Sequence, residues 1–367
     1  MTILFFTRLF YPHIGGVERH VYEVSRELVA RGHKVTIVTE KFDEDSAEQQ
    51  EFEGMEVYRI PVGKNEWIKK FVIWRWLFVH RKLMKQANVI HCNDVFFWYL
   101  PFRFFYLTKK IFITFHGYEG NDIPNKRSVL MHKIAEKFSL GNICIGEFLR
   151  KWYNTKPNFI SYGGVNPLGE RIGYKKIEPR QKISFVFVGR LERETGIMVY
   201  LRAMQVVQAR GFAVNLIILG DGSKRNEAER FCQKNKLSAK FTGFVTDMDR
   251  YIFAAHFVFT SRYLGIIEAL SRKKFVFAVY NNEIKKDYLY MTPFVDFFSI
   301  TKDDNALSEE IVFHIQNQHV AFEKTKKGFL WAEKQTWERL TDTYLQLWTK
   351  KERGSSGRFR AGGDTFY

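Results

Sequence analysis

The sequence is poor in cysteine and contains no long apolar run. Its three cysteines, Cys92, Cys144 and Cys232, lie far apart and lack the spacing of metal ligands. They are typical of buried thiols in a reducing compartment and do not indicate a disulfide framework. No apolar run reaches the roughly 18 residues that span a membrane, and the first strand-like run begins at Ile3 with no signal peptide before it. We therefore expect a cytoplasmic chain that is not integral to a membrane.

Acidic residues are few relative to basic ones. The 367 residues include 57 Lys and Arg but 40 Asp and Glu, which gives a net charge of +17. Segment 64–110 alone holds ten basic and two acidic residues, and it is dense in Trp and Phe. Such a surface favours an anionic membrane face or a nucleic acid. Because no nucleic-acid recognition motif accompanies the charge, we expect no nucleic-acid partner.

Length and periodicity predict two α/β domains. A chain of 367 residues with 46% apolar residues exceeds one ordinary core. Strand-like and helix-like segments alternate throughout, as in doubly wound parallel sheets. The expected strands are Ile3–Phe6, Val35–Thr39, Met55–Ile60, Val89–Cys92, Ile111–Phe115, Ile143–Ile145 and Asn158–Tyr162, then Ser184–Val188, Val214–Leu219, Phe241–Phe244, Phe257–Thr260, Phe275–Val279 and Val295–Ser299.

The remaining segments set the expected domain limits. The acidic stretch Glu44–Glu53 predicts a surface loop, and 166–182, with two prolines and two glycines, predicts a linker between domains 1–165 and 183–330. Trp331–Trp348 predicts a closing amphipathic helix. The tail 351–367 lacks a core pattern, and we expect it to be disordered.

The loop Tyr11–Glu18 enters the first predicted helix, Val17–Ala30. Gly15 and Gly16 in this loop allow a ligand to approach the backbone, and a helix N-terminus suits a phosphate. The alternative is a turn that only needs positive φ. The adjacent glycine pair does not match the dinucleotide-binding pattern G-x-G-x-x-G.

The segment Asn65–Gln86 has the length of one helix. Trp67, Phe71, Trp74 and Phe78 fall on one face, and six Lys or Arg residues supply charge. Helices of this kind lie in membrane interfaces. The alternative is a helix whose aromatic residues pack on the sheet and whose basic face is solvated.

Several short motifs resemble, in order, those of the family-4 retaining glycosyltransferases of the GT-B fold. They are Pro12-x-x-Gly15-Gly16-Val17-Glu18, His116-Gly117, Gly163-Gly164-Val165-Asn166, Val188-Gly189-Arg190-Leu191, Leu219-Gly220-Asp221-Gly222, Phe241–Val245, Glu268-Ala269-Leu270 and Trp337-Glu338. Each is weak singly, but their order over residues 1–348 is specific. The resemblance implies two Rossmann-like domains facing a central cleft, and a closing helix that crosses back to the first domain.

The resemblance also implies an activity. Such enzymes move a sugar from a nucleotide diphosphate sugar with retention of anomeric configuration. The donor would be UDP- or GDP-linked, with no further cofactor and no metal. Together with the basic aromatic segment, this predicts a lipid-linked or cell-envelope glycan acceptor. It also predicts a peripheral location on the inner face of the cell membrane.

By the same resemblance, site residues can be assigned. Gly15 and Gly16 would approach the diphosphate, Arg190 would pair with it as it leaves, and Glu268 would bind the ribose hydroxyls. His116 would contact the transferred sugar or the acceptor. Gly243, Phe244, Ile266 and Ile267 would complete the donor site.

Each of these assignments has a structural alternative. Arg190 could form a surface ion pair with Glu192 or Glu194. Glu268 could be a carboxylate stabilised by the dipole of a helix it opens. A lone histidine such as His116 is often structural.

Two departures from the family pattern bear on activity. Position 195, five residues after Arg190, is Thr where the family usually has Lys. The charge of that lysine would then have to come from Arg193 or a nearby Lys. The first Glu of the family's Glu-x7-Glu element is absent, and Arg262 lies in that shortened run. A cation there would favour an acidic or phosphorylated ligand. Two alternatives stay open. One is another GT-B activity, such as epimerisation or hydrolysis of a nucleotide sugar, and the other, suggested by the missing Lys and Glu, is a non-catalytic nucleotide-sugar or glycan-binding protein.

Overall fold

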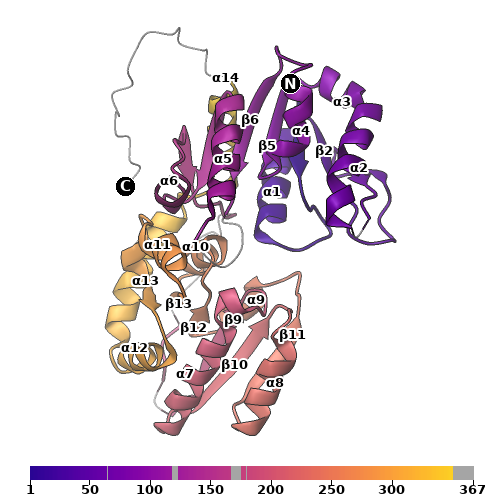
Figure 1. Cartoon of the computed structure of the whole chain (residues 1–367). Helices are drawn as coiled ribbons and strands as arrows, with labels where there is room; N and C mark the ends of the chain where they lie inside the picture. Colours follow the sequence, from indigo (N-terminus) through magenta and orange to yellow (C-terminus); the bar gives the residue numbers. More distant parts are fainter. Residues whose placement is uncertain (64, 118–122, 167–174, 179, 350–367) are drawn as a thin grey trace.

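The computed structural model describes residues 1–63, 65–117, 123–166, 175–178 and 180–349. The tail 351–367 and residues 167–174 and 179 of the expected linker lie outside the described residues. Figure 1 shows an N-terminal α/β domain above and a C-terminal α/β domain below. The last helix, α14 (Trp337–Thr349), returns to the upper domain.

The N-terminal sheet contains eight strands within the described residues, in the order β3-β4-β2-β1-β5-β6-β7-β8. Their bounds are β1 (Thr2–Thr7), β2 (Lys34–Glu40), β3 (Gln49–Phe52), β4 (Met55–Ile60), β5 (Val89–Asn93), β6 (Lys110–Phe115), β7 (Gly141–Ile145) and β8 (Phe159–Ser161). All neighbouring strands are parallel except β3 and β4. The seven strands expected in this half are therefore confirmed.

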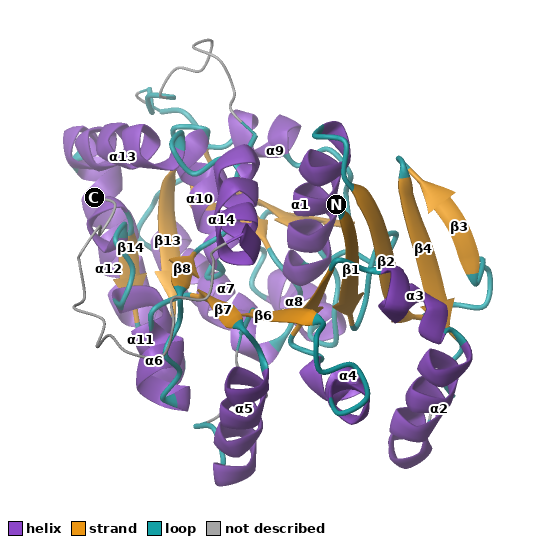
Figure 2. Ribbon diagram, turned by 90° about the horizontal axis from the view of Figure 1, so that it is seen from above, coloured by secondary structure: helices purple, strands orange, loops and turns teal. Residues whose placement is uncertain are grey.

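Helices cover both faces of this sheet. Figure 2 shows α1 (Gly16–Ala30) and α14 on one face, and α2 to α5 on the other. As a result, every residue of β5 and β7 is buried. Strands buried on both faces have continuous apolar runs, which explains why the sequence reveals them.

Strand β3 corrects one expectation. The acidic segment Glu44–Glu53 was expected to be a loop, but Gln49–Phe52 pairs antiparallel with β4 at the sheet edge. The chain reverses its direction between β3 and β4 at Glu53 and Gly54. Both residues have positive φ, 48° and 76°, as in the tight turns that join hairpin strands. A polar, half-exposed strand is typical of a sheet edge, and its sequence lacks the apolar run of the buried strands.

The C-terminal sheet contains six described strands in the order β11-β10-β9-β12-β13-β14, all parallel. Their bounds are β9 (Ile183–Val188), β10 (Val214–Leu219), β11 (Ala239–Gly243), β12 (Phe257–Phe259), β13 (Phe275–Val279) and β14 (Ser299–Thr301). The strand expected at Val295–Ser299 is wrong in position, because Val295–Phe297 forms the 3₁₀ turn η2. Phe294 and Phe298, four residues apart, are both buried, and this spacing suits a helical turn.

The helices that connect these strands cover both sheets. Besides α1 and α14 they are α2 (Glu66–Val79), α3 (Arg81–Gln86), α4 (Phe96–Arg103), α5 (Lys126–Phe138), α6 (Phe148–Tyr153), α7 (Ile197–Ala209), α8 (Arg225–Lys234), α9 (Asp249–Ala254), α10 (Tyr263–Ser271), α11 (Glu283–Tyr290), α12 (Asp304–Gln316) and α13 (Gln318–Ala332), with the short 3₁₀ turn η1 (Arg193–Thr195).

Two expected helices are each interrupted. The segment Asn65–Gln86 breaks at His80, whose Nδ1 lies 2.9 Å from the carbonyl of Trp76 and whose ring stacks on that indole. The segment Trp331–Trp348 breaks between α13 and α14. There, Thr336 pairs in parallel with Val165, and the Val165 N–H donates to the Gln335 carbonyl at 2.8 Å. The extended pairing explains why one continuous helix was the wrong prediction.

A buried hydrogen-bonded chain attaches α14 to the N-terminal sheet. The Trp348 indole N–H donates to His91 Nδ1 at 3.0 Å, and His91 Nε2 lies 2.8 Å from the Thr114 hydroxyl. The Tyr344 hydroxyl lies 2.8 Å from both Thr114 and His20 Nε2. Because an indole N–H only donates, His91 Nδ1 accepts, and the proton of the neutral His91 ring is on Nε2. His91 Nε2 therefore donates to Thr114, Thr114 donates to Tyr344, and Tyr344 donates to His20 Nε2. Burial lowers the pKa of His20 to about 3 and that of His91 well below its usual value.

This chain predicts a loss of stability in mild acid. Because the folded state depresses the histidine pKa values, the unfolded state binds more protons once the pH falls below about 6.5, and stability is lost from there toward pH 3. Each histidine that stays neutral in the folded state then lowers the free energy of unfolding by about 1.4 kcal/mol at pH 5.5. We expect the melting temperature to fall between pH 7.5 and 5.5, and to fall less in His20→Gln. The exposed His319→Gln is the control, and an equal fall in all three proteins would contradict this account.

Candidate functional site

The glycine pair at the start of α1 leaves room beside its backbone. Gly15 is the N-cap of α1 and is fully extended, with φ of −171°. Neither Gly15 nor Gly16 has positive φ, so the alternative of a turn that needs this conformation is wrong. A Cβ at Gly15 would collide with the carboxylate of Glu18, whereas a Cβ at Gly16 would meet nothing within 4 Å. The approach to the Gly16 backbone is therefore open.

Arg190 follows the carboxyl end of β9 and is 58% exposed. Its Nη2 lies 3.1 Å from Glu194 Oε1. Glu192 is engaged elsewhere, because its carboxylate accepts hydrogen bonds from the N–H and hydroxyl of Ser223, which lower its pKa. An exposed ion pair is weak, so an anionic ligand can compete for the Arg190 guanidinium.

Thr195 occupies the position at which the family pattern has a lysine. Its side chain is buried, and its hydroxyl contacts the carbonyls of Arg190 and Glu192 at 2.7 and 2.8 Å. It therefore holds the loop after β9 in shape and supplies no charge. The neighbouring Arg193 is exposed.

The loop between β12 and α10 brings further cations to this edge of the sheet. Arg262, the N-cap of α10, is 39% exposed, and its Nη2 lies 3.8 Å from the same Glu194 oxygen. Lys285 of α11 is buried, and its Nζ donates to the carbonyl of Ser261. Burial and then Arg262 depress the pKa of Lys285, against the effect of Glu194.

Glu268 is buried between the two domains. Its Oε1 forms an ion pair with Nη1 of Arg19, which lies on α1 of the N-terminal domain. Burial raises the pKa of Glu268, and the charge of Arg19 opposes that shift. Glu268 lies in the second turn of α10, so the alternative of a carboxylate at a helix start is wrong. Sequence spacing gave no signal for Arg19 as its partner.

The other residues assigned to the donor site differ in their accessibility. Gly243 ends β11 with φ of 74°, and the Phe244 ring that follows it is exposed. The side chains of Ile266 and Ile267 are fully buried in the core. Any ligand contact from these two isoleucines would therefore come from the backbone.

His116 follows the carboxyl end of β6. Its Nε2 lies 2.9 Å from Asn93 Oδ1, its N–H donates to Asp94 Oδ1 at 2.8 Å, and its ring packs edge-on against His20. Burial, and then His20, hold its pKa well below the usual value. Because the Asn93 amide oxygen only accepts, Nε2 carries the proton, and Nδ1 of this half-buried neutral imidazole can accept a hydrogen bond without adding charge.

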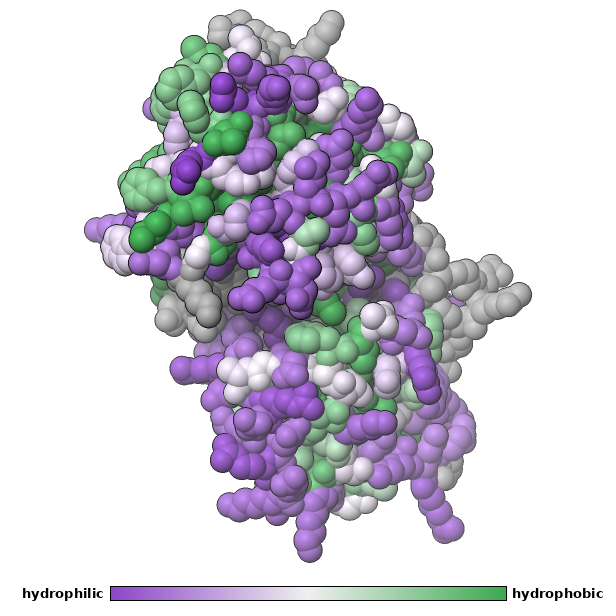
Figure 3. Space-filling model, turned by 90° about the vertical axis from the view of Figure 1, so that its right-hand side faces the viewer, coloured by the Kyte–Doolittle hydropathy of each residue, from purple (hydrophilic) through white to green (hydrophobic). Residues whose placement is uncertain are grey.

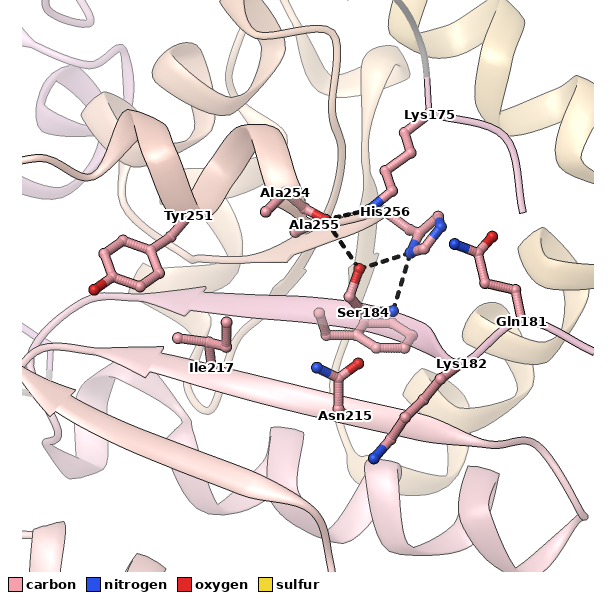
Figure 4. Close-up of a pocket in the computed structure, with 11 residues that line it drawn as sticks. Lys175, Gln181, Lys182, Ser184, Asn215, Ile217, Tyr251, Ala254, Ala255 and His256 are labelled. Atoms are coloured by element: carbon pink, nitrogen blue, oxygen red, sulfur yellow. Dashed lines mark hydrogen bonds between the residues drawn. The ribbon is translucent and has the colours of Figure 1, made fainter. Parts of the chain in front are cut away.

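A separate cavity of about 230 Å³ lies at the opposite end of the C-terminal sheet. Figure 4 shows Ser184 and His256 facing each other there, and His256 Nδ1 accepts from the Ser184 N–H at 3.0 Å. Ser184 is the second residue of β9, whereas Arg190 follows its carboxyl end. The cavity is therefore distinct from the site around Arg190.

The described residues contain no group of three or more His, Cys, Asp or Glu placed to hold a metal ion. Two Asp-x-Asp triplets occur, at 43–45 and 247–249. Asp43 binds Ser46, and Asp249 pairs with Arg272. No described helix is long and apolar enough to cross a membrane.

Comparisons with known proteins agree with this architecture. The chain is 23% identical over 250 residues to the phosphatidylinositol N-acetylglucosaminyltransferase GPI3 subunit of Saccharomyces cerevisiae, covering 63% of this chain and 55% of that protein. The chain thus spans about half the length of the curated relatives it matches.

Solved structures show the same fold. Sucrose-phosphate synthase from Thermosynechococcus elongatus has a TM-score of 0.74 at 16% identity, covering 95% of this chain and 98% of that one. WaaG, a glycosyltransferase involved in lipopolysaccharide biosynthesis, has a TM-score of 0.66 at 15% identity, covering 95% and 99%. These neighbours confirm the expected GT-B fold.

Two family models match successive parts of the chain. Residues 14–156 match glycosyltransferase family 4, and residues 182–316 match glycosyl transferases group 1. The first match covers α1 and the strands from β2 to β7, and the second covers the C-terminal sheet and the segments that contain Arg190 and Glu268. The chain therefore belongs to the family-4, group 1 glycosyltransferases of the GT-B fold.

Proposed function

We propose that the protein is a retaining glycosyltransferase that moves a sugar from a nucleotide diphosphate sugar to a lipid-linked or cell-envelope glycan at the cytoplasmic face of the membrane. The observation that carries the donor half is the open Gly16 backbone together with Arg190, which only an exposed ion pair engages. The donor is UDP- or GDP-linked. In the reaction, the bond from the anomeric carbon to the diphosphate breaks, and a bond to an acceptor oxygen forms on the same face.

The chain's own residues can support each part of this step. The Gly16 N–H and the start of α1 face the diphosphate, and Arg190 leaves Glu194 to neutralise the charge that the diphosphate gains. The acceptor proton passes to that leaving group. Neutral His116 orients the transferred sugar or the acceptor without competing for the diphosphate.

The nucleoside would lie on the C-terminal domain. The exposed Phe244 ring offers a stacking surface for the base, beside Gly243 at the end of β11. Glu268 keeps Oε1 on Arg19 and accepts hydrogen bonds from the ribose hydroxyls through Oε2. Arg19 would thus hold Glu268 ionised in its buried position.

The proposal of a lipid-linked acceptor is based on the exposed surface of α2. Trp67, Phe71 and Phe78 are exposed, Trp67 to 81%, whereas Trp74 is half-buried. Three of the four expected stripe residues therefore face solvent, which argues against the alternative that this stripe packs on the sheet. Figure 3 shows apolar side chains gathered on this side of the N-terminal domain.

Cations border this apolar surface. Lys70 and Arg81 lie over the rings of Phe71 and Phe78, and Lys82 is exposed. Lys69 differs from the other cations, because it pairs with Glu40 at 2.6 Å. A second exposed apolar group, Phe104, Phe105 and Leu107, follows α4. Aromatic side chains with adjacent cations suit an anionic bilayer, and the yeast relative is named for a phosphatidylinositol.

One alternative has a specific observation in its favour. Thr195 supplies no charge, and Glu268 is already paired, so the site is also compatible with a protein that binds nucleotide sugars without turning them over. Release of free nucleotide diphosphate in the presence of acceptor lipid separates this alternative from the transferase.

Arg190→Ala should weaken binding of UDP or GDP by about tenfold or more, because a charge-assisted contact contributes roughly 1.5–3 kcal/mol. Calorimetric titration of the diphosphates measures the effect. Arg210→Ala is the control, because it also removes one ion-paired arginine, the partner of Glu309, but at the far end of α7. Equal affinities in all three proteins would show that Arg190 does not hold the diphosphate.

The ribose assignment predicts a specific coupling between Glu268 and the nucleotide. The wild type should bind UDP or GDP about tenfold more tightly than the 2′-deoxy forms, since a hydrogen bond to a carboxylate is lost. In Glu268→Gln this preference should shrink to threefold or less. If the preference persists unchanged in the variant, Glu268 acts only as the partner of Arg19.

The membrane assignment predicts salt-sensitive binding to vesicles that contain phosphatidylglycerol. Each cation near an anionic surface contributes about 1 kcal/mol, so Lys70, Arg81 and Lys82 changed to Ser should reduce co-sedimentation at least tenfold. Trp67→Ser with Phe71→Ser should reduce it further at high salt. Leu330→Ser, an exposed apolar residue on α13, is the control. A wild type that stays in the supernatant at low salt would indicate a soluble acceptor.

A further inference from the structure

The loops after β9 and β12 place two guanidinium groups against one carboxylate, that of Glu194. Glu194 Oε1 lies 3.1 Å from Nη2 of Arg190 and 3.8 Å from Nη2 of Arg262. Among the described residues, Glu194 is the carboxylate in ion-pair contact with either guanidinium. β9 and β12 are neighbours in the sheet, so both arginines project from adjacent loops at its carboxyl edge.

Lys285 adds a third positive group beneath the same loop. Its side chain is buried, its Nζ donates to the carbonyl of Ser261, and it lies 3.9 Å from the centre of the Tyr288 ring. Ser261 directly precedes Arg262. An anion bound at Arg262 would therefore stabilise the charged form of Lys285, which burial and Arg262 itself now disfavour.

We propose that the donor of this protein carries a negatively charged sugar, with the carboxylate of a uronic acid bound by Arg262 above Lys285. This inference rests on the proposed function, which assigns the diphosphate to Arg190 and Gly16. Both guanidinium groups flank one oxygen of Glu194, so a single nucleotide sugar can present its diphosphate to Arg190 and a sugar carboxylate to Arg262. A planar guanidinium matches a carboxylate in a bidentate geometry.

The charge at position 262 distinguishes this site from one that binds a neutral sugar. The family pattern that the sequence resembles has a carboxylate in this region, the first Glu of its Glu-x7-Glu element, and a carboxylate can accept hydrogen bonds from sugar hydroxyls. Arg262 can only donate, so it cannot reproduce those contacts with hydroxyl protons. A neutral hydroxyl can accept a single uncharged hydrogen bond from Arg262, whereas a carboxylate on the sugar accepts two and also balances the charge of the guanidinium.

Calorimetric titrations with two matched pairs test the proposal, UDP-glucuronic acid against UDP-glucose and GDP-mannuronic acid against GDP-mannose. In at least one pair the wild type should bind the acidic member at least tenfold more tightly. Arg262→Gln should reduce that preference to threefold or less, and Arg262→Glu should reverse it. Binding of UDP or GDP without a sugar should change less than threefold in both variants.

Arg210→Gln is the matched control, because it removes one ion-paired arginine of the same domain at the other end of α7. It should keep the preference of the wild type. Equal or tighter binding of the neutral sugars by the wild type overturns the proposal. So does an equal loss of affinity for the nucleotide diphosphates and both nucleotide sugars in Arg262→Gln, since Arg262 would then belong to the diphosphate site. Failure of the wild type to bind any of these nucleotides would instead refute the proposed function.

Discussion

Glu268 places a carboxylate where the two domains meet, in surroundings that exclude water. A buried charge is costly unless it is paired, and here the partner, Arg19, comes from the other domain. The same interface packs the Tyr162 ring edge-on against Tyr263, and the Tyr162 hydroxyl donates to the Met291 carbonyl. The position of one domain on the other is therefore tied to the ionisation of a residue in the candidate donor site. Any ligand that reaches Glu268 acts on this interface as well.

Charge in the donor loops is distributed differently from the family pattern. A buried hydroxyl, Thr195, shapes the loop that would otherwise carry a lysine. Cations enter the same region from other elements, Arg262 from the start of α10 and Lys285 from α11. Lys285 is ninety residues from Thr195 in the sequence, so comparison of motifs along the chain shows the loss of one cation but not the presence of another.

The fold could be predicted where one local property decides the structure. Strands such as β5 and β7 are buried on both faces, and their apolar runs identify them. β3 could not be found in this way, because an edge strand needs no apolar face. The helix breaks near His80 and Thr336 depend on contacts with Trp76 and Val165 that periodicity does not describe. Likewise the Arg19–Glu268 pair joins residues from two domains, and no spacing rule connects them.

The return of α14 to the N-terminal sheet affects how the chain can fold during synthesis. All strands of the N-terminal sheet have been synthesised once β8 is translated. The face of the sheet that Tyr344 and Trp348 cover nevertheless stays exposed until α14, the last helix, has been translated. His20 and His91 remain without their hydrogen-bond partners on α14 for all that time. Although domains generally fold in the order in which they emerge from the ribosome, the N-terminal domain here completes its core after the C-terminal sheet has been made.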